Sequence, residues 1–193
     1  MKVQFGSGHS LEGVISLEPT FVPSTSALTD EFQETSPHDN AIADVVSTPG
    51  LGLVPELLIT SVDESLDFWC RLCGFEVLYD RPEDGFAYIA SGTAHIMLET
   101  MGIGRNWIPA ALELPLGRGI NFQITVPSIE PIVAALRVAS WDLFMEPETK
   151  WYRTGAIEAG VGQFLVQDPD GYLIRFQASL GRRPVEPTSV LSQ

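Results

Sequence analysis

The chain changes character near residue 53. Before that point, hydrophobic and polar residues follow neither the two-residue period of a strand nor the helical period of about 3.6 residues, while Ser, Thr, Pro and acidic residues are frequent. Residues 1–50 are therefore predicted to form a flexible acidic tail. Residues 53–180 are predicted to form one folded domain, followed by a C-terminal tail of residues 181–193.

The first half of the domain predicts one helix among four strands. Residues 56–60 are mostly apolar and end at Ser61, which opens a segment with capping-box spacing. Apolar residues then recur at helical spacing as far as Gly74, a typical helix stop. Three strands are predicted after that, over residues 75–79, 86–89 and 94–99. The predicted order is β-α-β-β-β.

The second half repeats this order. A strand is predicted over residues 120–126, a helix capped by Ser128, a strand over 141–145 and a final hairpin around 168–171. The hairpin turn is Asp-Pro-Asp-Gly, in which Pro fixes φ, an Asp side chain caps the bend and Gly accepts a positive φ. The fold class is therefore predicted as α+β, with two tandem βαβββ modules that form a cupped mixed sheet. Such a cup is a place for a ligand, and the open edges of its sheets favour dimerisation.

The net charge of the chain limits the kinds of partner that it can bind. The net charge is −14; residues 1–50 hold seven acids and one Lys, so −8 remains for the rest. This disfavours nucleic acid and anionic membranes and suits a cationic ligand, although acidity also serves solubility alone. No apolar run approaches the roughly 20 residues of a membrane span, and no signal peptide is recognisable, so a cytoplasmic protein is expected.

The cysteine and histidine content argues against redox and metal chemistry. Cys70 and Cys73 form a Cys-x-x-Cys pair at the end of the predicted helix, where packing is the favoured interpretation over a redox pair. No second cysteine pair completes a zinc site. His95 is the one histidine of the domain, because His9 and His38 lie in the tail. Imidazole-rich iron or zinc sites therefore cannot be built within one chain.

The final hairpin, Gln163 to Phe176, resembles the C-terminal signature of the vicinal-oxygen-chelate superfamily, which includes glyoxalase I, extradiol dioxygenases and bleomycin resistance proteins. The resemblance covers roughly residues 53–180. It includes the duplicated order, the helix stop at Gly74, the segment from Gly92 to Glu99 and the Asp-Pro-Asp-Gly turn. The implied fold is the glyoxalase/bleomycin resistance fold.

In metal-binding members of that superfamily, four equivalent strand positions supply the ligands. They correspond here to Pro55 or Glu56, Glu99, Asn121 and Arg175. A permanently charged guanidinium replaces the expected Glu at Arg175 and cannot ligate a divalent cation. We therefore expect no metal and no cofactor. Arg175 is hypothesised to replace the cation and to face the same cavity as Glu99; alternatively, it extends to solvent.

Within the superfamily the chain resembles the bleomycin resistance proteins most. These are metal-free, acidic homodimers that sequester a planar cationic drug, which implies aromatic faces and carboxylates at the site. The residues predicted to bind the ligand are Tyr79, Phe86, His95, Glu99, Trp107, Asn121, Trp151 and Arg175. Core packing is the alternative for each aromatic residue, and a hydrogen-bonded wall position is the alternative for His95.

Three functions remain open, the third being a small-molecule sensor or interaction module in which the acidic tail contacts another protein. The first is a metal-free protein that sequesters a bleomycin-type or related planar cationic antibiotic, without catalysis, in an aromatic and acidic groove of a homodimer. The alternative is a metal-dependent lyase, isomerase or dioxygenase of the same fold, with a metal held by Glu56, Glu99 and a residue of a partner chain. The ligand itself cannot be deduced from these residues.

Overall fold

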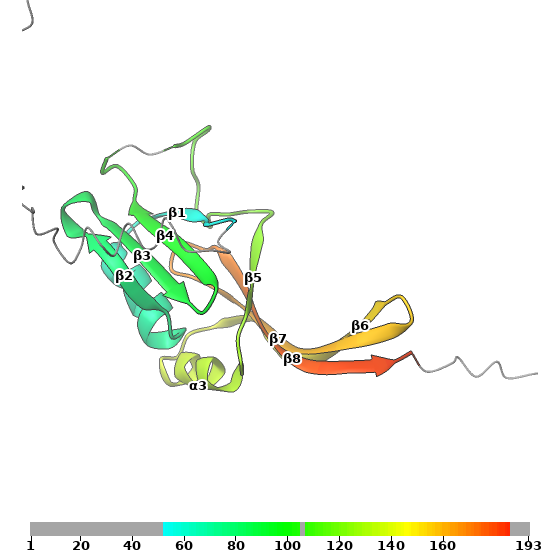
Figure 1. Cartoon of the computed structure of the whole chain (residues 1–193). Helices are drawn as coiled ribbons and strands as arrows, with labels where there is room; N and C mark the ends of the chain where they lie inside the picture. The colour runs from blue at the N-terminus through cyan, green and yellow to red at the C-terminus, as the bar shows by residue number, and fades with distance from the viewer. Residues whose placement is uncertain (1–51, 105–106, 186–193) are drawn as a thin grey trace, which may run out of the picture. The chain divides into compact units, whose positions relative to one another are not determined.

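The computed structural model describes residues 52–104 and 107–185 (Figure 1). The predicted tail of residues 1–50 and the last eight residues lie outside the described part. Two four-stranded sheets are present, in the orders β1-β4-β3-β2 and β5-β8-β7-β6. In both, the first strand pairs in parallel with the last and the remaining pairs are antiparallel. The prediction of two tandem βαβββ modules is confirmed.

The first sheet and its helical segments agree with the sequence pattern. Its strands are β1 (Glu56–Ile59), β2 (Glu76–Arg81), β3 (Phe86–Ser91) and β4 (Ala94–Thr100). The helix begins as α2 (Val62–Leu66), where the Ser61 hydroxyl accepts a hydrogen bond from the Glu64 amide at 3.3 Å. It continues as a π-helix, η1 (Asp67–Leu72), and the chain turns away at Gly74 with φ +76°. A 3₁₀ turn, η2 (Pro82–Asp84), joins β2 to β3.

The second module differs from the prediction in three places, and the first is the strand predicted over residues 141–145, which is β6 and spans Leu143–Thr154. The strands of this module are β5 (Asn121–Thr125), β6 (Leu143–Thr154), β7 (Ile157–Gln167) and β8 (Leu173–Pro184). Helix α3 (Glu130–Val138) has Ile129 as its N-cap residue, so Ser128 does not cap it; the Ser128 hydroxyl bonds to the Glu130 carboxylate instead. Strand β8 also continues to Pro184, past the predicted domain boundary at residue 180.

One hydrophobic core joins the two modules. Phe68 of η1 lies 5.1 Å from Trp141, measured between ring centroids. The core sides of both sheets contribute to the same cluster, through Ile59 and Leu98 of the first sheet and Phe176 of the second. Because neighbouring side chains of a strand point to opposite faces, the alternate residues of each sheet point away from this core. Each module therefore has one outward sheet face.

Two hydrogen bonds hold the Asp168–Gly171 turn against β1. The Tyr172 hydroxyl donates to the Leu58 carbonyl at 3.1 Å, and the Thr60 amide donates to Asp170 Oδ1 at 3.0 Å. The turn itself closes as predicted, with the Gly171 amide donating to the Asp168 carbonyl and φ +91° at Gly171. A Cβ at Gly171 would lie 2.3 Å from Pro115 Cβ, so Gly is required there. No helix within residues 52–104 and 107–185 is long and apolar enough to cross a membrane.

Candidate ligand-binding site

The outward face of the first sheet gathers aromatic and acidic side chains. Cross-strand register pairs Phe86 with Glu99, Tyr88 with Met97 and Ala90 with His95, so these six residues share one face. Glu56 on β1 is the register partner of Met97 and joins them. The alternate residues of β4, Ile96 and Leu98, are buried in the core. Strand alternation alone therefore separates the site from the core.

Four aromatic rings form a row on this face. Tyr79 stacks on Tyr88 with 5.1 Å between centroids and 19° between planes, and on Phe86 at 5.8 Å and 29°. His95 meets Tyr88 edge-on at 5.6 Å, and its Nδ1 lies 3.2 Å from the Tyr88 hydroxyl oxygen. Tyr88 is only 4% exposed and Phe86 5%, so the half-buried Tyr79 and His95 form the accessible surface. Burial and the nearby Tyr79 raise the pKa of Tyr88.

A carboxyl pair borders the aromatic row. Burial chiefly, together with a hydrogen bond and charge repulsion from Glu99, raises the pKa of Glu56. The following loop approaches the pair, since a Cβ at Gly104 would lie 3.6 Å from Glu99 Oε1. The repulsion between two carboxylates held side by side falls when one of them binds a proton or when a cation binds between them. The pair is therefore a place where positive charge is stabilised.

The turn after β2 adds further charge. Asp80, Glu83 and Asp84 are all exposed there. The Arg81 guanidinium lies 3.8 Å above the Phe86 ring centroid and donates to Asp84 at 3.0 Å. Arg81 thus covers one end of the aromatic row and neutralises one of the three acids.

The outward face of the second sheet is polar and carries Arg175. Register places Gln123 of β5 beside Arg175 of β8, and the Arg175 guanidinium donates to the Gln123 side-chain oxygen. Arg175 forms no ion pair within residues 52–104 and 107–185, and its buried Nε has no hydrogen-bond partner there. Gln163 donates to Glu148 at 2.8 Å and to the Tyr152 hydroxyl at 2.9 Å. This face offers amides and one guanidinium.

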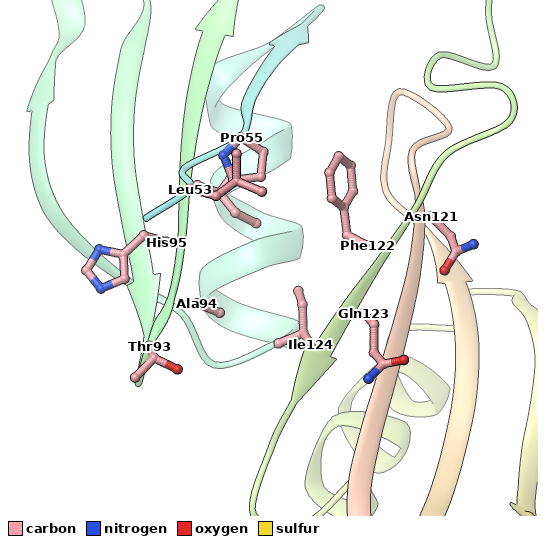
Figure 2. Close-up of a pocket in the computed structure, with 10 residues that line it drawn as sticks. Leu53, Pro55, Thr93, Ala94, His95, Asn121, Phe122, Gln123 and Ile124 are labelled. Carbon is pink, nitrogen blue, oxygen red and sulfur yellow. The ribbon is translucent and has the colours of Figure 1, made fainter. Parts of the chain in front are cut away.

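A cleft lies between the two sheets, where residues 93–96 of the first module approach β5. It has a volume of about 290 Å³. Figure 2 shows Phe122 and Ile124 pointing into it, whereas Asn121 and Gln123 point away on one side and His95 on the other. Arg175 does not line it. Of the predicted site residues, only His95 and Asn121 line this cleft.

The structure gathers half of the predicted ligand-binding residues. Tyr79, Phe86, His95 and Glu99 share the first outward face, but Asn121 and Arg175 lie on the second sheet. Glu99 lies beside Glu56 and Arg175 beside Gln123, and no ion pair joins Glu99 to Arg175 among the described residues. Their predicted common cavity stays a prediction that requires a second chain.

The two tryptophans predicted at the site belong to a loop and to β6, not to the strands of the first sheet. Trp107 is in the loop between the modules and is 71% exposed. Trp151 packs on Gly160, where a Cβ would lie 2.7 Å from its ring, and beneath Arg183, whose guanidinium is 4.0 Å from the ring centroid. Sequence reasoning also missed Tyr88. The cross-strand pairing of β2 with β3, which sets Tyr79 opposite Tyr88, is the signal that reveals it.

Neither the cysteines nor the carboxylates form a metal or redox centre in the described part. Cys70 and Cys73 are free thiols, and burial raises the pKa of both, strongly so for Cys73 beside Asp168. A raised pKa keeps the thiol protonated and unreactive. Nowhere in the described ranges do three or more His, Cys, Asp or Glu side chains converge as for a metal. Glu56 and Glu99 supply two carboxylate ligands and Arg175 none, so a divalent ion would lack a third ligand among the described residues.

Comparisons with known proteins identify the family. No protein-family model matches the chain, and no curated protein matches it. A glyoxalase/bleomycin resistance protein/dioxygenase superfamily member from Vibrio splendidus 12B01 is 35% identical over 65% of this chain and 95% of its own, with a TM-score of 0.31.

Two further solved structures are similar. TioX from Micromonospora sp. ML1 is 23% identical over 66% of this chain and 98% of its own, with a TM-score of 0.51, which supports the same fold. A glyoxalase/bleomycin resistance protein/dioxygenase from Alicyclobacillus acidocaldarius is 12% identical over 66% and 90%, with a TM-score of 0.46. On the identity shared with the Vibrio protein across nearly all of its length, this chain belongs to the glyoxalase/bleomycin resistance protein/dioxygenase superfamily.

Proposed function

We propose that this chain is a small-molecule binding protein that sequesters a planar cationic compound, such as a bleomycin-type antibiotic, on the outward face of its first sheet. One observation carries the proposal: the Tyr79–Tyr88 stack lies on the same face as the Glu56–Glu99 carboxyl pair. Aromatic side chains stack on planar ligands, and a cation nearby would stabilise the ionised form of Glu56, whose pKa is raised, beside Glu99. The half-buried Tyr79 offers the accessible ring surface.

The proposed site is completed by a second copy of the chain. The outward faces of one chain point away from their shared core, so no single chain can enclose a ligand between them. Strand β1 pairs with β4 alone and β5 with β8 alone in the described part, which leaves both strands with a free edge. A homodimer that joins β1 of one copy to β5 of the other would bring Arg175 opposite Glu99.

Arg175 supports binding over catalysis. In the proposed dimer its guanidinium, which lacks an ion pair within the described chain, supplies positive charge where metalloenzymes of the superfamily hold an ion. It can orient an oxygen of the ligand by hydrogen bonds, but it can neither polarise a substrate as a Lewis acid does nor exchange protons near neutral pH. Capture without chemical change is the activity that this residue supports.

The alternative is a metal-dependent lyase, isomerase or dioxygenase. The Glu56–Glu99 pair favours it, because two carboxylates at the family's ligand positions are half of a metal site. Elemental analysis of the purified protein separates the two functions. A stoichiometric divalent metal would support the enzyme, and the variant Arg175→Glu should take up zinc or nickel if Arg175 alone prevents metal binding in the binding protein.

The proposed function is tested by isothermal titration with copper-free and copper-bound bleomycin at low and moderate salt. Binding should weaken as salt rises. Tyr79→Ala should weaken it by about tenfold, or about 1.4 kcal/mol. Tyr79→Phe keeps the ring and is the matched control, with affinity close to that of the unmodified chain. Equal binding by the unmodified chain and Tyr79→Ala, or no binding of either drug form, would overturn the proposal.

A further inference from the structure

Strands β6, β7 and β8 continue beyond the core as an arm, defined here as residues 147–161 together with 179–184. The ladder stays paired to its end, from Lys150 opposite Val161 to Ile157 opposite Pro184. No arm residue belongs to the hydrophobic core, and Figure 1 shows the ribbon extending past α3 with no helix over it. A ribbon with two uncovered faces gains little stability by itself, so packing on another surface is expected.

The arm has the opposite charge to the rest of the chain. It holds four basic residues, Lys150, Arg153, Arg182 and Arg183, against Glu148 and Glu158, a net +2 that leaves −16 for all other residues. Arg183 is occupied by Glu158 at 2.7 Å and by the Trp151 ring. Lys150 and Arg182 form no ion pair within the described part of the chain.

These two free cations share one face of the arm. Register sets Tyr152, Ala159 and Arg182 in one cross-strand row, and Lys150 opposite Val161 in the next row of the same face. Tyr152 is 43% exposed, while Val161 and Ala159 are half-buried. Glu148, opposite Gln163 in the row beyond Lys150, lies on the same face and accepts a hydrogen bond from Gln163. The face is therefore apolar at its centre, with Lys150 and Arg182 at opposite margins and one acid beside Lys150, a composition that suits an acidic protein surface.

The same face continues into the outward face of the second sheet, past a register shift between β7 and β8 at Gly160 and Val161. Along β7, alternate residues lead from Val161 to Gln163 and Leu165, and Leu165 is the register partner of Arg175. Whatever covers Arg175 is thus positioned to cover the arm as well. In the proposed dimer that neighbour is the second copy, whose charge outside its own arm is −16.

We infer that the arm is a clasp: its Lys150–Tyr152–Arg182 face docks on the acidic surface of a second copy of this chain. The inference rests on the pairing of two copies in the proposed function and adds which segment holds them together. Opposite charge draws the copies together, and burial of Tyr152 and the apolar centre holds them. Because this attraction acts between partly exposed charges, the dimer should weaken as salt rises.

Lys150 permits a direct test, because the only other lysine of the chain is Lys2. Equal amounts of unlabelled and ¹⁵N-labelled full-length protein are mixed and treated with a carbodiimide, which joins a lysine to a carboxylate in contact with it. Peptides that link Lys150 to an Asp or Glu are then weighed. Mixed-isotope links are expected. Links of a single isotope only would mean that the arm meets its own chain, for example residues 1–50, and would overturn the inference.

Charge reversal provides the second measurement. The double variant Lys150→Glu and Arg182→Glu should raise the dimer dissociation constant at least tenfold in analytical ultracentrifugation. The control, Arg118→Glu with Arg137→Glu, makes the same change in net charge at exposed sites of other elements and should change it less than twofold. A dimer that both variants weaken equally would overturn the clasp and leave the pairing of copies intact. A chain that stays monomeric at all concentrations would overturn the pairing as well, whereas loss of bleomycin binding alone would bear only on the ligand.

Discussion

The first sheet presents stacked rings and a carboxyl pair on its outward face, whereas the second presents amides and one guanidinium. Both faces arise from the same order of elements and the same register of first strand against last. Glu99 and Arg175 occupy equivalent last strands, yet one has a like-charged neighbour, Glu56, and the other a neutral amide, Gln123. The two modules share an architecture and differ in the chemistry of their exposed positions.

The difference between the two outward faces shows at which strand positions the residue type can vary without loss of the fold. On the core sides, Leu98 and Phe176 are completely buried in one shared cluster, so only apolar residues are tolerated there. The outward positions contribute little to this core, so they can carry charge without unfolding the chain. The proposed dimer would place the two kinds of face opposite each other, and its ligand site would then have both an acidic and a basic wall.

The largest effect should come from breaking the core that supports both faces. Trp69 is completely buried and packs edge-on against Phe68 and Phe75. Trp69→Ala is expected to lower the free energy of unfolding by about 3–5 kcal/mol, measured by urea denaturation. Tyr79→Ala, on the outward face, should cost far less. Equal losses for the two variants would contradict the division into core and outward sides.

The Asp168–Gly171 turn makes the free energy of unfolding depend on pH. Burial, opposed by backbone hydrogen bonds and reinforced by Asp170, raises the pKa of Asp168 from 3.8 to about 7. The folded chain thus binds this proton more tightly than the unfolded chain, so the contribution is full below about pH 4 and is lost as pH rises through 7. Asp168→Asn should remove the loss, and its advantage over the unmodified chain should grow by about 2–3 kcal/mol between pH 5 and pH 8.

Urea denaturation at both pH values measures this difference. The exposed Asp142→Asn in the same module controls for removal of a carboxyl group. An advantage of Asp168→Asn that is the same at pH 5 and pH 8 would show that Asp168 does not titrate in this range in the folded chain.

The carboxyl pair can be separated from the aromatic row on the same face. Glu99→Gln removes the neighbour whose hydrogen bond and charge help to raise the pKa of Glu56, so that pKa should fall, as followed by NMR titration. Affinity for a cationic ligand should fall by about three- to tenfold. A pKa of Glu56 that stays unchanged in this variant would leave burial as its only cause.

The smallest effect is expected on the arm. Arg183→Ala removes both the contact with the Trp151 ring and the ion pair with Glu158 and should destabilise the arm by about 0.5–1 kcal/mol. Hydrogen exchange of the amides of residues 158–161 reports this local opening. Arg182→Ala, which removes a neighbouring guanidinium without ring or ion-pair contacts in the described part, should accelerate this exchange less.

Most of the fold follows from local patterns in the sequence. Apolar alternation gives β3 and β4, the Ser61 cap and Gly74 give the limits of the first helical segment, and the Asp-Pro-Asp-Gly turn gives the last hairpin. The sequence pattern predicts the structure wrongly where a residue type fits two local structures, and it predicts nothing where no periodicity is present. Ser128 has a cap-forming side chain, but its hydroxyl donates to the Glu130 carboxylate and accepts no backbone amide among the described residues, and Ile129 is the N-cap residue. The arm lies in mixed polar sequence whose strands are held by cross-strand pairing alone.

The candidate site, like the fold, was predictable from the sequence only in part. The sequence by itself determined which side chains face outward, since alternation along a strand assigns Glu99, His95 and Arg175 to faces without knowledge of the rest of the chain. Only the tertiary structure decided which of them meet: it set Tyr88 beneath Tyr79, Glu56 beside Glu99, and the two outward faces away from each other. The alternation of side chains along a strand is a local property of the sequence. Strand register and the packing of two sheets on one core depend instead on contacts between residues far apart in the chain.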